Sequence, residues 1–401
     1  MTTLIDNVKI ITLDNQGTIE NGYILIKGDH FQEVSAGHSS NKCDKKIDGQ
    51  GMVVMPGFVD CHTHLMEYAT AELHQTQGPA QRMAGIANLL IALKSGIVAV
   101  GEHHLGHPVL NQTTKEYQVI TNNIPIDVKL AVGCCFIGTD PLTLVSSTHP
   151  GRIIDKDKDL TGEEIKHMAI NSDFPGENIF LNATVANLPL SAAPKAGHVT
   201  FNYEDIETFV RVFHSYGKKI GAHIEGDIAA EMFINAGGDV IHHGHGISNK
   251  VAELMAKKNV SLVVTPHGGT SSVPLSPEEV YQFYKLGVNI AIASDSYLPP
   301  HPMVTWLDLP QDYLVGPEDF LKITRPFLKY FLDQGELLED TLKLITVNGR
   351  RLLSNNKENG TITSGNKADC IICQQIPGIG TIDTTTIKYV IKNGHPVVVR
   401  E

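Results

Sequence analysis

The sequence predicts an α/β protein in which a (β/α)8 TIM barrel carries a small β-sandwich domain formed by both termini. Three observations lead to this prediction: eight apolar, strand-like runs alternate with helix-like segments, both ends are rich in short strands, and histidines gather where the runs end. Strands that are apolar on both faces and alternate with helices belong to parallel sheets covered by helices. Eight such units within 401 residues fit a barrel.

The two ends of the chain share one character, which is short strands separated by turns. Residues 1–51 contain "LIDNVKIITLD" and "GYILIKGDHFQEV", and residues 350–401 contain "ADCIIC" and "IKYVIKNGHPVVV". Gly, Asn and Pro separate these runs, as turns between strands require. We therefore expect residues 1–51 and 350–401 to form the sandwich, and residues 52–349 to form the barrel.

In the middle of the chain, segments with helical periodicity separate the strands. Two of them, "NYEDIETFVRVFHSYGKK" and "SNKVAELMAKKNV", repeat apolar residues every three or four positions. A doubly wound open sheet is the alternative, but no GxGxxG follows the first strand. The expected barrel strands are residues 52–60, 96–102, 126–136, 178–186, 219–225, 239–244, 260–266 and 289–295.

Composition narrows the class of protein. The 44 acidic and 32 basic residues give a net charge of −12, which argues against a nucleic-acid or anionic-membrane partner. No apolar run reaches the roughly 18–20 residues that span a bilayer, and the N-terminus lacks the pattern of a signal peptide. Six cysteines in so long a chain indicate reduced thiols. We expect a cytoplasmic protein that acts on a small molecule, with a homo-oligomer as the default assembly.

Metal-binding and acid–base residues gather at the predicted C-terminal ends of the strands, where barrel active sites lie. The first strand ends in "DCHTH", and residues two apart in a strand face the same way, so His62 and His64 project together. Imidazoles with one carboxylate suit zinc or ferrous iron, with a position left open for a hydrolytic water. Other strand ends present Glu102, His103, His223, Glu225, His242, His243, His245, His267 and Asp295.

These motifs together resemble the amidohydrolase superfamily, in its deaminase, imidazolonepropionase and prolidase-like branches. The matching elements are "PGFVDCHTH", "GAHIEGD", "DVIHHGHG", "IAIASDS", "TLKLITVNGRRLLS" and "GTITSGNKADCIIC", which extend over nearly the whole chain. The resemblance implies that Asp295 accepts the proton of the attacking water, and that His243 either binds a second metal or hydrogen-bonds the water and substrate. It further implies one divalent metal ion, Zn or Fe, held by His62, His64, His223 and Asp295.

Two departures from the family pattern bear on this interpretation. Members with two metals usually carry a lysine on the fourth strand, whereas "ENIFLNATVAN" has none, so one ion is favoured and a second is left open. Deaminases in the family usually show His-x-x-Glu on the fifth strand, but here Glu225 follows His223 by two positions. Glu225 shares the face of His223, and we assign it either to proton transfer or to a structural ion pair.

Neighbouring side chains are candidates for contacts with the substrate. In the sixth strand we prefer His243 to its neighbours because the Gly244 that follows it preserves the HG pair of the prolidase-like and imidazolonepropionase-like members that the chain resembles. Alternation then places His242 on the opposite face of the strand. His245 shares the face of His243. The candidates for substrate binding are Glu102, which could instead serve a second metal, His103, His245 and His267.

The assignments predict a metal-dependent hydrolase that cleaves a carbon–nitrogen bond other than those of ordinary proteins. Deamination and opening of a cyclic amide in a small polar metabolite both fit. A prolidase-like dipeptidase is the alternative: the spacing on the fifth and sixth strands favours it, and the missing lysine opposes it. A non-catalytic barrel that serves as a binding scaffold is a third hypothesis, which the intact ligand positions disfavour.

Overall fold

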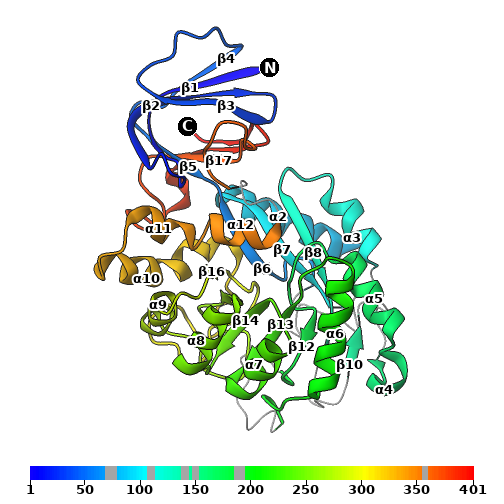
Figure 1. The fold of residues 1–401 in the computed structure, drawn as a ribbon. Helices are drawn as coiled ribbons and strands as arrows, with labels where there is room; N and C mark the ends of the chain where they lie inside the picture. The colour runs from blue at the N-terminus through cyan, green and yellow to red at the C-terminus, as the bar shows by residue number, and fades with distance from the viewer. Residues whose placement is uncertain (68–78, 106–112, 137–143, 147–152, 185–194, 355–359) are drawn as a thin grey trace.

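The computed structural model describes residues 1–67, 79–105, 113–136, 144–146, 153–184, 195–354 and 360–401. Figure 1 shows two units: a smaller one made of strands that holds both termini, and a larger one in which helices surround the strands. The larger unit carries the candidate site, so its strands are described with the residues that they position.

The smaller unit is a sheet whose strands come from both ends of the chain: β1 (Thr2–Ile11), β2 (Thr18–Lys27), β3 (His30–Ala36), β4 (Lys45–Asp48), β5 (Val53–Pro56), β17 (Cys370–Cys373), β18 (Ile387–Lys392) and β19 (His395–Val399). Their order is β19-β18-β17-β5-β1-β2-β3, and β4 pairs with β1. β5 joins the two ends of the chain, because it pairs parallel with β1 and antiparallel with β17.

The apolar side chains of this sheet form a core of their own, in which Ile5, Ile24 and Phe31 pack with Ile372 and Ile391. A small β domain drawn from both termini is therefore present. The run predicted as one strand, residues 52–60, is divided at Gly57: β5 belongs to the terminal sheet, and the barrel begins with the next strand. The terminal sheet extends to Pro56 through β5, a few residues beyond the predicted boundary at residue 51. The division of the domains at residues 51 and 350 stays a prediction.

The larger unit contains the predicted parallel strands: β6 (Phe58–Thr63), β7 (Ile97–His104), β8 (Asp127–Val132), β9 (Cys134–Phe136), β12 (Ile179–Phe180), β13 (Gly221–Glu225), β14 (Val240–His245), β15 (Ser261–Val264) and β16 (Ile290–Ile292). Every pairing between neighbours in this series is parallel. Two short strands, β10 (Leu144–Ser146) and β11 (Ile153–Ile154), extend the edge at β9 in antiparallel fashion. The end of the predicted strand 178–186 lies outside the described residues.

The parallel strands form two sheets rather than one closed ladder among the described residues. β6, β7 and β8 make one sheet, and β9 and β12–β16 belong to the other, with only Gly133 between β8 and β9. On the opposite side the first and last strands meet just beyond β16. There Asp295 N donates to His62 O, and His64 N donates to Ser296 O, each at 2.9 Å. The order of strands around the axis is that of a TIM-barrel-like α/β fold.

Helices connect and cover these strands (Figure 1). α6 (Tyr203–Ser215) and α8 (Asn249–Lys258) form in the two segments predicted from their helical periodicity. α6 begins after a reciprocal capping box of Asn202 and Asp205, and α8 begins after Ser248, whose side chain accepts from Val251 N. No helix in the described part of the chain combines the length and apolar character needed to cross a membrane. The helices are α2 (Pro79–Lys94), α3 (Thr114–Thr121), α4 (Lys156–Asp159), α5 (Gly162–Asn171), α6 (Tyr203–Ser215), α7 (Gly226–Asn235), α8 (Asn249–Lys258), α9 (Pro277–Lys285), α10 (Phe320–Asp333), α11 (Leu338–Lys343) and α12 (Val347–Leu353), with short 3-10 turns η1 (Pro317–Asp319) and η2 (Thr384–Thr386).

Four charged side chains join the terminal sheet to the barrel. Asp127, at the start of β8, lies 2.7 Å from Arg350 Nη1 and 3.0 Å from Lys392 Nζ. Asp369 pairs with the same two cations, at 2.8 Å from Lys392 Nζ. Burial alone would raise the pKa of Asp127, but Arg350 and Lys392 hold that pKa below its ordinary value of 3.8. Buried charges are tolerated only when paired, so this group holds the two units in one relative position.

Candidate metal centre

His62 and His64, which we call the HxH pair, lie at the end of β6, and both imidazoles are buried. Thr63, between them, faces away and donates to Glu102 Oε2 at 2.7 Å. His62 and His64 therefore share one side of the strand, with their ring centroids 5.5 Å apart.

Asp295 follows β16 and faces this pair. Its Oδ1 lies 3.2 Å from His62 Nε2 and 3.5 Å from His64 Nε2. The backbone of Asp295 is left-handed, with a φ of 49°, which is uncommon for a residue that carries a side chain. The hydrogen bond from its N–H to His62 O holds this conformation where the first and last strands meet.

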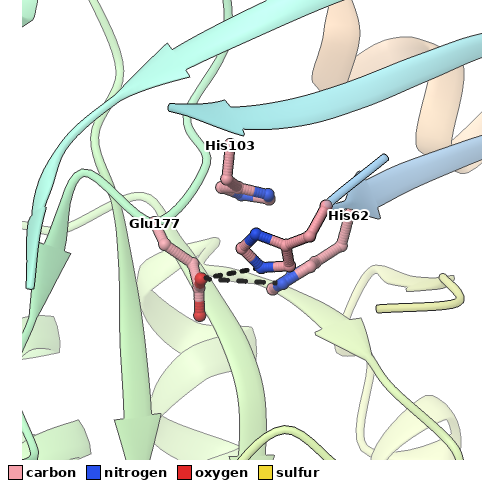
Figure 2. Close-up of side chains that lie close together, drawn as sticks. His62, His103 and Glu177 are labelled. Carbon is pink, nitrogen blue, oxygen red and sulfur yellow. Dashed lines mark ion pairs between the residues drawn. The ribbon is translucent and has the colours of Figure 1, made fainter. Parts of the chain in front are cut away.

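Glu177, which immediately precedes Asn178 and β12, is the central carboxylate of the site and is 1% exposed. Its Oε2 lies 3.6 Å from His62 Nε2 (Figure 2). The same oxygen lies 3.8 Å from His64 Nε2. The Oε1 of Glu177 lies 2.7 Å from both His223 Nδ1 and His243 Nε2. One carboxylate thus contacts two groups of imidazoles through different oxygens.

The electrostatics of the site depend on this carboxylate. Burial would raise the pKa of Glu177, yet His62, His223 and His243 around it hold that pKa well below its ordinary value. At His243 burial opposes the charged form, but Glu177 outweighs burial and raises the pKa of the imidazole. Burial lowers the pKa of His62 well below its ordinary value, and that of His242 to about 4. An ionised carboxylate among imidazoles is an anionic centre of the kind that binds divalent cations.

The spacing of the donor atoms indicates whether a cation fits. The four nitrogen–oxygen separations that link His62 and His64 to Asp295 and Glu177 run from 3.2 to 3.8 Å. Metal bonds of about 2.0–2.2 Å at tetrahedral angles put ligand atoms roughly 3.3–3.6 Å apart. His62 Nε2 also has no hydrogen-bond partner among the described residues, although it is buried. These residues therefore fit a divalent cation. Three sets of potential ligand atoms lie within 4.8 Å of one another: His62, His64, His103 and Glu177; His62, His243 and Asp295; and Glu177, His223 and His243.

The expected ligand set of His62, His64, His223 and Asp295 stays a prediction, and Glu177 is an additional carboxylate among these side chains. His223 directs Nδ1 at Glu177 and stacks on Phe180, with ring centroids 4.3 Å apart and planes 8° apart. His243 reaches the same oxygen of Glu177 from β14. Glu177 therefore lies between the pair His223–His243 and the HxH pair, and the arrangement is one of two groups that share a carboxylate.

His242 is not on the opposite side from the site, as strand alternation had suggested. Its Nδ1 lies 2.9 Å from His62 Nδ1, and the two ring centroids are 4.9 Å apart. His242 follows the alternation of β14 and faces the same side as Val240, which packs with Cys61 and Val263. The left-handed backbone at His243, with a φ of 67°, turns His243 to that side as well. Both histidines consequently point toward the site.

Glu102, predicted as a substrate contact or a second-metal ligand, lies behind the HxH pair. Its carboxylate accepts hydrogen bonds from Thr63 Oγ1, from Leu65 N at 2.9 Å and from Met66 N at 2.7 Å. Burial raises the pKa of this carboxyl to about 7. These bonds hold the turn after the HxH pair, and they favour a supporting role over contact with a substrate.

His103, the next residue along β7, lies directly against the HxH pair. Its ring centroid is 4.2 Å from that of His62 (Figure 2). The centroid of His64 is 5.2 Å away. The Nδ1 of His103 is 3.3 Å from Thr63 O, whereas its buried Nε2 has no hydrogen-bond partner among the described residues. This placement is compatible with the predicted contact to a substrate.

Glu225, the candidate for proton transfer, is engaged with a loop. Ser271 Oγ donates to its Oε1 at 2.7 Å, and Ser272 N donates to its Oε2 at 2.9 Å. The backbone N–H of Glu225 donates to Asn182 Oδ1 at 2.9 Å. Both oxygens thus hold the loop that follows β15, which favours the structural alternative, through hydrogen bonds rather than an ion pair.

His245 and His267 differ in whether their ring nitrogens have hydrogen-bond partners. His245 lies between two hydroxyls, with Nδ1 2.9 Å from Thr270 Oγ1 and Nε2 3.3 Å from Thr265 Oγ1. His267 is also buried, but neither of its ring nitrogens has a hydrogen-bond partner within the described chain. Burial lowers the pKa of His267 to about 4. Of the two, His267 is the imidazole with nitrogens left for a ligand.

Gly269 brings the backbone of the loop that follows β15 against His243 and Asp295. Its φ is +118°, and a Cβ added there would lie 2.3 Å from His243 Cε1 and 2.4 Å from Asp295 Oδ2. Only glycine satisfies both the conformation and the space.

Sequence reasoning missed Glu177 because it searched for a lysine at the C-terminal end of the fourth strand. The residue stands at the opposite end, in "PGENIF", just before the strand begins. The available indication was an acidic residue directly before a predicted barrel strand, in a segment that also contains polar residues such as Asp173 and Asn178.

A TIM-barrel-like fold with imidazoles and carboxylates gathered at its strand ends defines the class of metal-dependent barrel hydrolases. The model of the amidohydrolase family matches residues 53–397, so the chain belongs to that family. It is therefore an enzyme, a metal-dependent hydrolase that acts on carbon–nitrogen bonds.

Relatives matched over most of the chain share low sequence identity with it. The imidazolonepropionase of Caldanaerobacter subterraneus subsp. tengcongensis is 23% identical over 385 residues, which cover 88% of this chain and 84% of the relative. A 5-methylthioadenosine/S-adenosylhomocysteine deaminase of Clostridium tetani is 46% identical over 67 residues, 16% of each chain. Among solved structures, a prolidase complexed with N-methylphosphonate-L-proline has a TM-score of 0.77 at 16% identity, with both chains fully covered. That likeness establishes the shared fold.

Proposed function

We propose that this protein is a two-metal amidohydrolase that hydrolyses an amide bond in a small polar molecule, with cyclic amides as the leading substrate class. The observation that carries the proposal is the carboxylate of Glu177. It presents Oε2 to the HxH pair and Oε1 to His223 and His243. It offers the shared oxygen ligand that the missing lysine of the fourth strand would otherwise supply.

Two ions, Zn or Fe, suit this set of imidazoles and carboxylates. We assign one ion to the HxH pair with Asp295 Oδ1 and Glu177 Oε2, where the donor atoms already have the spacing of ligands. The second belongs to Glu177 Oε1 with His223 and His243, whose two 2.7 Å hydrogen bonds would have to open to roughly 3.3 Å or more for a cation to replace their protons. When bound, such ions lower the pKa of a water molecule and polarise the carbonyl of the substrate.

Asp295 is the group that moves the proton. Its Oδ1 faces the HxH pair, while Oδ2 is buried without a hydrogen-bond partner among the described residues. We assign Oδ2 to take a proton from the attacking water as the water oxygen bonds to the carbonyl carbon. The same proton passes to the leaving nitrogen as the carbon–nitrogen bond breaks. His103 and His267, which have unpaired buried nitrogens, are the candidates for orienting the substrate.

Amide hydrolysis is favoured over deamination by the position of Glu225. Deamination of a heterocycle needs an acid that protonates the ring nitrogen, and both oxygens of Glu225 are occupied by Ser271 and Ser272. Two relatives matched over most of the chain are imidazolonepropionases, which supports a cyclic amide. A dipeptidase is the second candidate, because Glu177 answers the objection raised by the missing lysine and a prolidase shares the fold.

Metal content tests the shared carboxylate. We expect two ions per chain in the wild-type protein, about one in His223→Gln, and loss of both in Glu177→Ala. His214→Gln is the matched control, since His214 pairs with Asp239 on the surface, and it should keep two ions. A wild-type protein with one ion, unchanged in His223→Gln, would contradict the two-metal proposal.

A substrate panel tests the reaction. The loaded enzyme is assayed on lactams and imidazolones for ring opening, on Xaa-Pro dipeptides for amino-acid release, and on adenosine-type amines for ammonia. We expect ring opening to dominate, and Asp295→Asn to lower it by about 10²–10⁴-fold, the range of general-base catalysis. Ammonia release as the main activity would refute the amide assignment.

A further inference from the structure

His242 is a buried histidine whose two ring nitrogens both have partners. Its Nε2 lies 3.0 Å from Pro175 O, and its Nδ1 lies 2.9 Å from His62 Nδ1. It is 0% exposed, so water does not compete for either nitrogen. The result is a chain of three groups that begins at a backbone carbonyl and ends at the first histidine of the HxH pair.

The direction of this chain follows from the chemistry of its first member. A carbonyl oxygen can only accept, so the proton between His242 and Pro175 belongs to His242 Nε2. A neutral imidazole has one N–H, and Nδ1 of His242 is consequently an acceptor. The proton between the two imidazoles must then be on Nδ1 of His62. His62 is left with its lone pair on Nε2, the nitrogen that faces Asp295 Oδ1 at 3.2 Å and Glu177 Oε2 at 3.6 Å.

We propose that His242 is a positioning residue that fixes the tautomer and orientation of His62, so that Nε2 is presented as a metal ligand. The inference rests on the proposed role of His62 in the metal centre. Removing a hydrogen-bond partner of this kind from a metal-binding histidine typically weakens metal binding by about 10–100-fold. The same bond also anchors Pro175, two residues before Glu177, so that β14 holds the segment that carries the shared carboxylate.

A second histidine of the site is oriented by the same logic. Thr265 Oγ1 donates to Gly268 O at 2.6 Å, and a hydroxyl has only one proton to give. His243 Nδ1, 2.8 Å from Thr265 Oγ1, must therefore be the donor in that pair. This directs Nε2 of His243 to Glu177, just as His242 directs Nε2 of His62.

Two substitutions separate the hydrogen bonds from the volume of the side chain. His242→Gln retains both functions, because its amide N–H can donate to Pro175 O and its amide oxygen can accept from His62 Nδ1. His242→Leu retains an apolar side chain of moderate size and neither hydrogen bond. We expect the leucine variant to bind Zn²⁺ about 10–100-fold more weakly in a chelator competition, as loss of such a partner implies, and the glutamine variant to stay close to wild type.

The tautomer is measured directly by ¹⁵N NMR of the imidazoles in the wild-type chain, with His62→Gln to assign the resonance. We expect His62 to carry its proton on Nδ1, and this result does not depend on whether the leucine variant folds. An Nε2–H tautomer in the metal-free wild type, or a folded leucine variant with wild-type Zn²⁺ affinity, would overturn the inference. If His62→Gln itself binds Zn²⁺ normally, the proposed metal centre fails instead, so the two failures are distinguishable.

Discussion

Gly269→Ala is expected to disable the site without unfolding the protein. The new Cβ would lie 2.3 Å from His243 Cε1 and 2.4 Å from Asp295 Oδ2. Carbon atoms in contact prefer separations of about 3.5–4.0 Å, so the imidazole or the loop must move by roughly 1 Å or more. A misplacement of that size at reacting groups lowers the rate by about 10²-fold.

The backbone adds a second effect that must be separated from the first. The φ of +118° at Gly269 is one that alanine rarely adopts, and such strain costs about 1–3 kcal/mol of stability. Gly287 has a similar φ of +94°, but the nearest atom to an added Cβ is Ala256 Cβ at 3.8 Å. Gly287→Ala is therefore the matched control, with comparable strain and no collision.

The assay compares kcat/KM, metal content and urea unfolding for both variants. We expect both to lose a similar amount of stability, and only Gly269→Ala to lose activity, by about 10²-fold, the cost of a 1 Å misplacement. If Gly269→Ala keeps wild-type kcat/KM and metal content, the contact of this loop with His243 and Asp295 is not what positions them.

Three further predictions concern the supporting structure. Lys392→Met leaves Arg350 as the one cation facing Asp127 and Asp369 within this group. We expect urea unfolding to show a loss of about 3–5 kcal/mol, because that is the cost of breaking a buried ion pair. The surface variant Lys250→Met should change the stability little, and equal effects of the two variants would contradict the role of burial. The pKa of Asp127 lies below its ordinary value of 3.8 in the folded chain, so its stabilisation is complete above pH 3.8 and is lost as the pH falls further. The destabilisation caused by Asp127→Asn, measured by urea unfolding, should accordingly shrink below that pH, and a constant difference would refute it. Glu225→Gln should keep at least a tenth of the wild-type kcat with its pH profile unchanged, because the amide can still accept from the Ser271 hydroxyl; a shifted pH profile would restore Glu225 as the acid.

The local pattern of the sequence was sufficient for the strands and for the first histidine pair. Apolar runs of strand length and the alternation of side chains placed His62 and His64 on one side of β6, where the structure has them. The helices α6 and α8 begin after Asn202 and Ser248, where polar capping residues precede the periodic segments. These features depend on neighbours within a few positions, which a single sequence contains.

Alternation failed where the backbone departs from a regular strand. His242 follows the alternation of β14 and contacts His62, 180 positions away, while a left-handed φ at His243 brings that residue to the same side. Nothing in "DVIHHGHG" distinguishes that conformation from a regular strand except the glycine that follows. The assignment of His242 to the other side was wrong for this reason.

The sequence by itself determined the class of chemistry, because imidazoles and carboxylates at the ends of parallel strands must meet at one end of a barrel. Only the tertiary structure decided how they divide. It brought Glu177 between the HxH pair and the pair His223–His243, and it engaged Glu225 with a loop 46 positions away. Hydrogen bonds over such separations are set by the packing of one strand against another, which no periodicity within a strand encodes.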